Sequence, residues 1–238
     1  MPLLPSVAVR DRQDELMDDP QLDGERHDAA LRGLSRINSI SGSSKVVWRP
    51  IVQLAKQQGL KKLRILDVAT GSGDIPISLW KKARHSDLEL EILGIDISSK
   101  AVETSRQRAE TAKASVRFET HDALADDLPD NYDVITTSLF THHLENDAIV
   151  QLLRRMAKAA NQLVLVNDLI RSRWNLLMVH LASRLLTRSK VVHVDGPLSV
   201  RAAFTVDEFR TLADRVGLAG GTISKRWPCR FLLQWRKP

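Results

Sequence analysis

The sequence predicts an α/β fold with a seven-stranded, mostly parallel sheet flanked by helices. From about residue 63 onward, short apolar runs alternate with longer amphipathic segments, as in strands joined by crossover helices. The first run, LRILDVA at 63–69, is nearly continuous, as expected for a central strand buried on both faces. The last two runs have no helical segment between them, which predicts a terminal pair of short strands.

The expected strands follow from these runs in chain order. They occupy 63–69, 88–96, 115–122, 132–140, 162–169, 221–227 and 231–237. Helices are expected at 74–83, with Pro76 tolerated in the first turn, at 98–113 behind a serine cap, and at 145–160. A further helix begins at the capping box Thr205–Glu208 and ends near Gly217.

Residues 170–200 interrupt the alternation, and we interpret them as a helical lid inserted into a core domain at 61–238. Residues 171–190, RSRWNLLMVHLASRLLTRSK, carry apolar residues at helical spacing among arginines, which predicts a basic amphipathic helix. The next segment, VVHVDGPLSVRAAF, is expected to be irregular because Asp195–Gly196–Pro197 is typical of a turn. Residues 1–60 are expected to form a loose tail followed by capping helices.

Length, cysteine content and charge limit the class of protein. The 238 residues suit one α/β domain with extra helices, and the single cysteine, Cys229, permits no internal disulfide. No apolar run approaches the ~20 residues of a membrane span, and the start MPLLPSVAVR does not resemble a signal peptide, so we expect a cytoplasmic protein. Residues 1–150 carry a net charge of −5 and residues 151–238 a net charge of +11. Solvated helix faces, RNA, anionic lipid and an anionic substrate are all compatible with the basic third.

A glycine loop between the first strand and its helix, ILDVATGSGDIP at 65–76, predicts a ligand site. A triphosphate-binding loop is excluded, because Gly71-Ser72-Gly73-Asp74 lacks the required lysine and hydroxyl positions. A dinucleotide loop would have a small third residue at 76, where this chain has Pro76. Asp67 and Asp74 would repel a pyrophosphate but would attract an ammonium or sulfonium group. The loop therefore favours S-adenosylmethionine (SAM), whose carboxylate can meet amides at the helix N-terminus.

Acidic residues follow the next two strands as well. Asp96 ends the second strand, 25 residues after Gly71, where a carboxylate can accept hydrogen bonds from ribose hydroxyls. Asp122 follows the third strand, at an edge where it could accept from an adenine amino group. Two of these acids could instead have a structural role: Asp67 could pair within its loop, and Asp122 could cap the following turn.

These motifs resemble those of the class I SAM-dependent methyltransferases, a Rossmann-like superfamily. LDVATGSGDI resembles the first motif of the ubiquinone and menaquinone biosynthesis methyltransferases, and GIDIS, THDA and VITTSLFTHHL resemble later motifs of the superfamily. The resemblance covers about residues 60–170 and the later part of the chain more loosely. It implies SAM as cofactor, and its contacts would be Asp67, Gly71, Ser72, Gly73, Asp96, Ile97, Asp122, Ala123 and Ser138.

Four residues are candidates for catalysis. His142 and His143 follow the fourth strand, where open α/β sheets place their ligands, and either could be a general base. Asp168 after the fifth strand and His193 in the lid are weaker candidates. No metal site is predicted, because adjacent histidines on extended backbone would point apart and the fourth strand ends without a carboxylate.

The sequence thus predicts a methyltransferase acting on a small, fairly apolar acceptor, phenolic, quinone-like or polyketide-derived, at oxygen or ring carbon. The apolar stripe of the lid could pack on the core, line the acceptor pocket or contact a membrane surface. An RNA methyltransferase and a non-catalytic SAM-binding protein remain alternatives. RNA is disfavoured by dispersed basic residues and an aromatic content of 5%.

Overall fold

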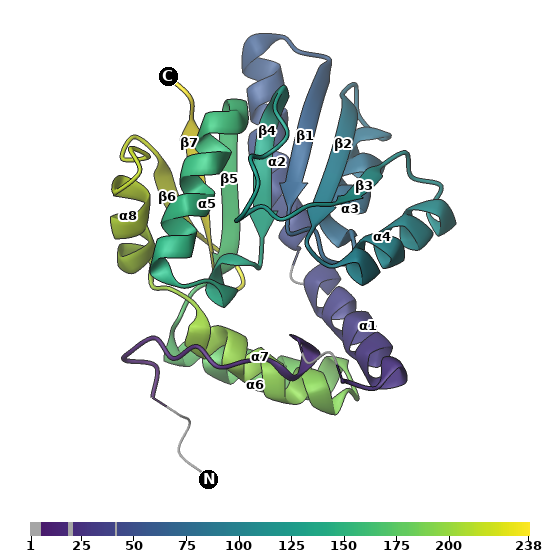
Figure 1. Ribbon diagram of the computed structural model, residues 1–238, viewed down its shortest axis with the longest axis vertical. Coiled ribbons are helices and arrows are strands. Elements are labelled where there is room, and N and C mark those ends of the chain that lie inside the picture. The colour runs from purple at the N-terminus through teal and green to yellow at the C-terminus, as the bar shows by residue number, and fades with distance from the viewer. Residues whose placement is uncertain (1–5, 19–20, 41) are drawn as a thin grey trace.

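A seven-stranded sheet forms the centre of the computed structural model, which describes residues 6–18, 21–40 and 42–238 (Figure 1). The strand order is β3-β2-β1-β4-β5-β7-β6, and only the two pairings that involve β7 are antiparallel. The predicted fold class is confirmed. The strands are β1 (Lys62–Val68), β2 (Glu89–Asp96), β3 (Arg117–Thr120), β4 (Tyr132–Ser138), β5 (Ala160–Leu169), β6 (Thr222–Arg226) and β7 (Arg230–Arg236).

Helices cover both faces of this sheet. They are α1 (Gly24–Ile40), α2 (Ser43–Gln58), α3 (Asp74–Ala83), α4 (Ser99–Thr111), α5 (Asn146–Ala159), α6 (Arg173–Leu186), α7 (Lys190–Ala202) and α8 (Val206–Asp214), with short 3-10 helices η1 (Leu16–Asp18) and η2 (Thr141–His143). The predicted caps are present, since Ser98 caps α4 and Thr205 with Glu208 forms the capping box of α8.

The continuous apolar run of β1 follows from burial on two sides. Ile65 packs in the apolar layer that α2 and α3 form, whereas Leu66 and Val68 pack in the layer of α5 and α8. Side chains alternate along a strand, so a strand covered on both faces needs apolar residues at successive positions. Asp67 interrupts this run and is buried all the same.

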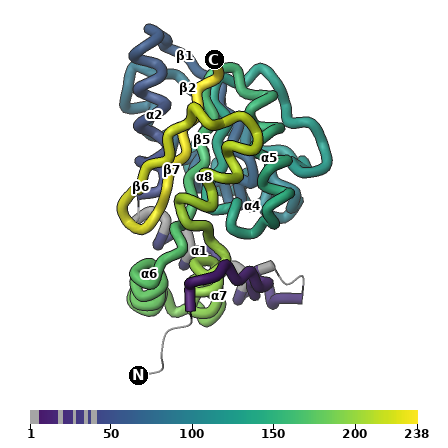
Figure 2. The backbone as a smooth tube through the Cα atoms, turned by 90° about the vertical axis from the view of Figure 1, so that its left-hand side faces the viewer, coloured from purple at the N-terminus to yellow at the C-terminus, as the bar shows by residue number. Residues whose placement is uncertain are grey.

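Helices α6 and α7 pack together beyond the carboxyl ends of the parallel strands, with α1 beside them (Figures 1 and 2). The prediction of an irregular segment at 191–204 is wrong, because residues 190–202 form α7. Burial of Val191, Val192 and Val200 on the helix stabilises it. Pro197 removes one backbone donor, but Asp195 does not act in a turn; instead its carboxylate accepts the backbone N–H groups of Leu16 and Met17.

The expected loose tail is also wrong for the described residues 6–18, which lie along α7 (Figure 2). Arg10 donates hydrogen bonds to the carbonyl oxygens of Ala202, His142 and Leu144. Its guanidinium also lies 4.0 Å from the centre of the Phe204 ring. These contacts hold the segment across the edge of the sheet where β4 and β5 end.

In the described part of the chain, no helix is both long and apolar enough to cross a bilayer.

Candidate functional site

The glycine loop connects β1 to α3 at the carboxyl edge of the sheet. Gly71 and Gly73 have φ values of +55° and +75°, a left-handed conformation that glycine adopts at little cost. A Cβ at position 73 would lie 2.9 Å from the ring of Phe118, whereas one at position 71 would meet nothing within 4 Å. Gly73 is therefore required for packing, and Gly71 leaves open space toward a ligand.

Asp67 ends β1 below this loop and is 2% exposed. Its Oδ2 accepts a hydrogen bond of 2.7 Å from the Thr70 hydroxyl, but its buried Oδ1 has no partner among the described residues. Burial raises the pKa of Asp67 to about 7, the Thr70 hydrogen bond opposes this shift, and the charge of Asp96 adds to it. A buried carboxylate with an unused oxygen is suited to a cationic partner.

Asp96 and Asp122 lie at the ends of β2 and β3, as predicted. One Asp96 oxygen accepts the N–H of Gly71 at 2.8 Å and the other accepts that of Ser98 at 2.9 Å, so the carboxylate is held beside the loop. The neighbouring Ile97 is 68% exposed and offers an apolar surface. Asp122 Oδ1 accepts two backbone N–H groups of the following turn, which is the capping alternative anticipated for it.

Asp74, expected with Asp67 to attract a cation at the loop, already has a cationic partner in the protein. The Asp74 carboxylate forms a salt bridge with Arg108 on α4, and Arg108 also donates to the Ser72 hydroxyl and carbonyl. Arg108 lies 34 residues after Asp74, on the next helix, so no local pattern in the sequence predicts that the two residues pair. The bridge ties the loop to α4, and Asp74 still lines the cavity beside the loop.

A cavity of about 430 Å³ opens beside the loop. One wall carries loop residues and Ser138, and the opposite wall carries inward-facing residues of α6 and α7. Its apolar lining comes from distant segments: Met17, Leu31, Ile37, Ile75, Leu139, Leu169, Met178, Val179, Ala182, Leu186 and Val192. Of the predicted cofactor contacts, Gly71, Ser72 and Ser138 line the cavity; the others, Asp67, Gly73, Asp96, Ile97, Asp122 and Ala123, do not.

His142 and Asp168 form a buried pair at the end of this cavity. His142 Nδ1 lies 2.7 Å from Asp168 Oδ1, and the other carboxylate oxygen accepts from the Thr141 hydroxyl at 2.5 Å. Burial lowers the pKa of His142, but the Asp168 carboxylate outweighs it and the pKa is raised; the pKa of Asp168 is lowered to about 2, because the His142 charge and hydrogen bonds outweigh burial. His142 lines the cavity and Asp168 does not, so Asp168 reaches the cavity only through its contact with His142.

The two histidines do not point apart, contrary to the sequence-based expectation. They lie on η2, not on extended backbone, and their ring centres are 4.3 Å apart. Burial and the charge of His142 lower the pKa of His143 to about 3, so its ring is neutral at physiological pH. Glu15 of the N-terminal segment completes the group: its carboxylate and the two imidazoles have candidate ligand atoms within 4.8 Å of one another, a spacing that a divalent ion could bridge.

His193 is not placed for catalysis. Its Nε2 lies 2.9 Å from the carbonyl oxygen of Thr187, and the ring does not line the cavity. The histidine therefore fastens the connection between α6 and α7.

Glu15 and Met17 were missed because the segment that carries them looks like an ordinary polar terminus. The one available signal was an excess of alternating charges at 10–15, of which Arg10, Asp11 and Arg12 find partners at residues 142–145 and 201.

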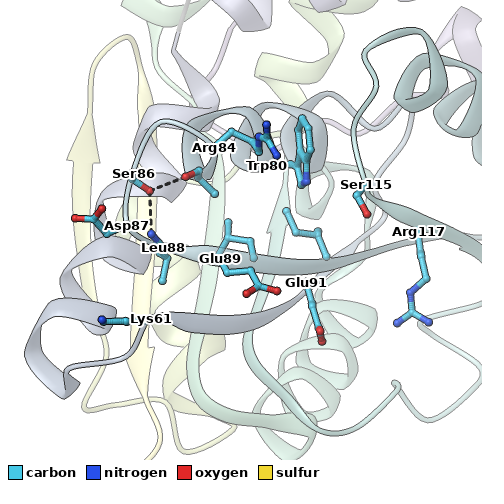
Figure 3. A pocket seen from close by; sticks show the side chains of 13 residues that line it. Lys61, Trp80, Arg84, Ser86, Asp87, Leu88, Glu89, Glu91, Ser115 and Arg117 are labelled. Atoms are coloured by element: carbon cyan, nitrogen blue, oxygen red, sulfur yellow. Dashed lines mark hydrogen bonds between the residues drawn. The ribbon is translucent and has the colours of Figure 1, made fainter.

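A second hollow, of about 960 Å³, lies at the opposite edge, where β1, β2 and β3 begin (Figure 3). Figure 3 shows charged and apolar side chains together around it, and Lys62 beside it pairs with Glu89 and Glu91. None of the predicted site residues lines it. Open parallel sheets bind ligands at their carboxyl ends, so the cavity beside the glycine loop is the candidate site.

Comparison with known families matches residues 65–162 to a methyltransferase domain. A demethylmenaquinone methyltransferase of Thermus thermophilus is 31% identical over 130 residues, which are 53% of this chain and 56% of that protein. A protein of the same name from Deinococcus radiodurans is 40% identical over 74 residues, 31% of this chain and 29% of that one. The chain thus matches about half or less of the length of these relatives.

Solved structures share the fold at low identity. The plantazolicin methyltransferase BpumL, in complex with a monoazolic desmethylPZN analogue and S-adenosylhomocysteine (SAH), has a TM-score of 0.65 at 16% identity, and the match covers 87% of this chain and 89% of that one. Magnesium protoporphyrin IX methyltransferase from Synechocystis PCC 6803 with bound SAH has a TM-score of 0.57 at 16% identity, covering 92% and 90%. The resemblance to class I SAM-dependent methyltransferases is confirmed.

Proposed function

We propose that this chain, which carries a class I SAM-dependent methyltransferase domain, methylates an oxygen or ring carbon of a small, largely apolar acceptor. The observation that carries this proposal is a single cavity that is bounded by the glycine loop, by apolar lid residues and by His142. A cofactor on the loop and an acceptor against the lid would share this space. Holding two reactants in one enclosed site supplies much of the acceleration in a displacement reaction.

The residues at the loop fit SAM. The unpartnered Asp67 Oδ1 supports a nearby ammonium, the two Asp96 oxygens retain acceptor capacity for ribose hydroxyls, and exposed Ile97 suits the face of an adenine. Gly71 leaves the approach to the backbone open. When bound, SAM supplies a methyl group on a positively charged sulfur. Ser72 and Ser138 complete the proposed contacts, with Gly73, Asp122 and Ala123 supporting the loop and the adenine side.

The cavity favours an acceptor with an apolar body and one ionisable group. Aliphatic side chains and methionines make up most of its apolar lining, while Glu15, His142 and His143 lie close together in it. A phenol or quinol matches this division, because its ring replaces water along the wall and its hydroxyl reaches the polar end. An apolar lining together with a small group of ionisable side chains supports a phenolic or quinone-like acceptor over a charged or strongly polar one.

His142 is the proposed general base. Its Nδ1–H donates to Asp168, so Nε2 carries the lone pair that can accept a proton from the acceptor hydroxyl. Asp168, with its lowered pKa, stays ionised and stabilises the imidazolium that results. His143 is neutral and packs against the His142 ring, which limits the rotation of the base.

The proposal is tested by incubating the chain with [methyl-³H]SAM and a panel of phenols, quinols, amines and structured RNA. Transfer of label to phenols or quinols, with loss in His142→Ala, supports it. Label only in RNA, or saturable SAM binding with no transfer to any acceptor, would overturn it in favour of the RNA or the non-catalytic alternative. The position of the label in each methylated phenol or quinol is then determined, which distinguishes transfer to oxygen from transfer to a ring carbon.

A further inference from the structure

Helix α6 has a second apolar surface that the cavity does not use. Trp174, Leu181 and Leu185 are 64%, 48% and 82% exposed, although α6 also presents Met178 and Ala182 to the cavity. Positions 174, 181 and 185 fall within about 40° of one another around a helix at 100° per residue, so they form one outward stripe. Large apolar side chains exposed in a row indicate an interaction surface.

The turn between β6 and β7 extends this stripe. Trp227 is 82% exposed there, and its neighbour Cys229 accepts a hydrogen bond from Asn175 of α6 through its carbonyl oxygen. Figure 2 shows the β6–β7 turn beside α6 on one side of the molecule. Two exposed indoles therefore stand on adjacent elements. In the described part of the chain, these two elements supply four of the eight large apolar side chains that are exposed.

The charged residues of α6 and of the β6–β7 turn are all basic. Arg173, Arg184 and Arg188 are exposed and form no salt bridge in the described part of the chain, and Lys225 flanks Trp227. Between Leu169 and Asp195 the sequence contains no acidic residue. Arg173 and Arg184 lie on the same flank of the stripe, about 80–100° from Trp174 around the helix. Apolar side chains bordered by unpaired arginines complement a surface that is both apolar and anionic.

We propose that the outer face of α6 and the β6–β7 turn form a docking surface for an anionic lipid membrane. Tryptophan favours the boundary between head groups and acyl chains, and each basic residue near an anionic leaflet adds electrostatic attraction. RNA is the less suitable partner, because leucines at 181 and 185 offer neither stacking nor charge. The surface rests on exposed residues of α6 and of the β6–β7 turn, and it does not depend on the proposed acceptor, although Trp227 also lines the cavity. It does place the wall of the apolar cavity against the bilayer, where a lipid-soluble acceptor would enter.

The test is co-sedimentation of the full chain with extruded vesicles, without SAM or acceptor. Vesicles of phosphatidylcholine with roughly 30% phosphatidylglycerol are expected to bind the chain about tenfold or more tightly than pure phosphatidylcholine. R173E/R184E should lose this gain, while K56E/K61E, an equal charge change at the opposite edge of the sheet, should keep it. Brominated lipids should quench tryptophan fluorescence, and W174F/W227F should remove most of that quenching.

Three results would overturn the proposal: no binding to anionic vesicles, equal loss in both charge variants, or binding to RNA with no quenching by brominated lipid. Circular dichroism of each variant confirms that the fold is retained. Methyl transfer to a water-soluble phenol is measured in parallel, and it should be unchanged in R173E/R184E. Failure of the vesicle assay with transfer intact would refute the membrane surface and leave the proposed function standing.

Discussion

The two halves of the candidate site are built differently. On the proposed cofactor side, Asp67, Gly71, Gly73 and Asp96 lie within 30 residues, at or just after the ends of consecutive strands of one sheet. On the proposed acceptor side, Glu15, His142 and Met178 come from an N-terminal segment, a 3-10 turn and helix α6. A local motif thus forms one half, and long-range packing assembles the other. A substitution in one half of the site should therefore leave the structure of the other half largely intact.

His142→Ala is expected to give the largest difference between an effect on turnover and an effect on SAM binding. Removing the base should lower kcat about 10²- to 10⁴-fold, the usual contribution of general acid–base catalysis, while the Kd for SAM changes less than about twofold. Calorimetry for SAM binding and initial-rate kinetics measure both. The matched variant is His193→Ala, which should retain kcat because its ring lies outside the cavity. A His142→Ala enzyme with unchanged kcat would remove the proposed base.

Asp96→Ala should produce the converse effect. Loss of a charged acceptor of hydrogen bonds is expected to raise the Kd for SAM about 10- to 100-fold, with kcat at saturating SAM nearly unchanged. Asp74→Ala, which removes the partner of Arg108 within the loop, controls for loosening of the loop alone and should weaken SAM less. Equal effects from both variants would show that loop rigidity, not the Asp96 carboxylate, determines affinity.

The pH dependence of SAM binding distinguishes the role of Asp67. In the free protein its pKa is raised to about 7, so below that pH the carboxyl must lose a proton to meet an ammonium. The affinity for SAM should therefore rise up to about tenfold per pH unit toward pH 7 and then level off. Asp67→Asn should bind more weakly at pH 7.5 and lose this slope. A slope that persists in the variant would assign the proton to another group.

The same raised pKa predicts an opposite effect on stability. Because the folded state favours the protonated Asp67, the free energy of unfolding without SAM should decline as pH rises from about 4 to about 7. His142 also has a raised pKa, so its contribution is present at low pH and is lost as pH rises through the folded value. Urea unfolding at several pH values should show a flatter profile for Asp67→Asn.

A smaller effect should follow from loosening the N-terminal segment. Asp195→Ala removes the acceptor of the Leu16 and Met17 N–H groups, so Glu15 and Met17 should leave the cavity wall more often. The acceptor KM is expected to rise about three- to tenfold, with the Kd for SAM unchanged. Hydrogen exchange should increase at residues 10–17. Asp214→Ala, an exposed carboxyl on α8, is the control; faster exchange with an unaltered KM would show that the segment only covers the lid.

Removal of metal ions tests the proton-transfer proposal against the cluster of Glu15 and the two histidines. If His142 Nε2 accepts the proton directly, dialysis against EDTA should leave activity within about twofold, and added Zn²⁺ should inhibit by occupying that nitrogen. Loss of activity on chelation, restored by a divalent ion, would contradict the assignment of His142 as base.

The sequence predicted the half of the site that is built from a local motif better than the half that long-range packing assembles. The strands along the chain and the acids at the ends of β1, β2 and β3 were predictable, because burial on two faces and strand-end positions leave local patterns. Arg108 opposite Asp74, the pairing of His142 with Asp168, and the path of residues 6–18 were not, because polar contacts between distant segments have no period or spacing. The turn predicted at Pro197 was wrong for a related reason, because the burial of valines on both sides of it stabilises helix α7 against the local turn signal.

The most direct test of this account is a crystal structure of the chain with SAH. We expect the amino end of SAH beside Asp67, its ribose on Asp96 and its adenine between Ile97 and Asp122, with the cavity at His142 left free for an acceptor. SAH bound in the hollow at the opposite edge, or lying across the His142 end of the cavity, would contradict the division of the site on which the proposed function depends.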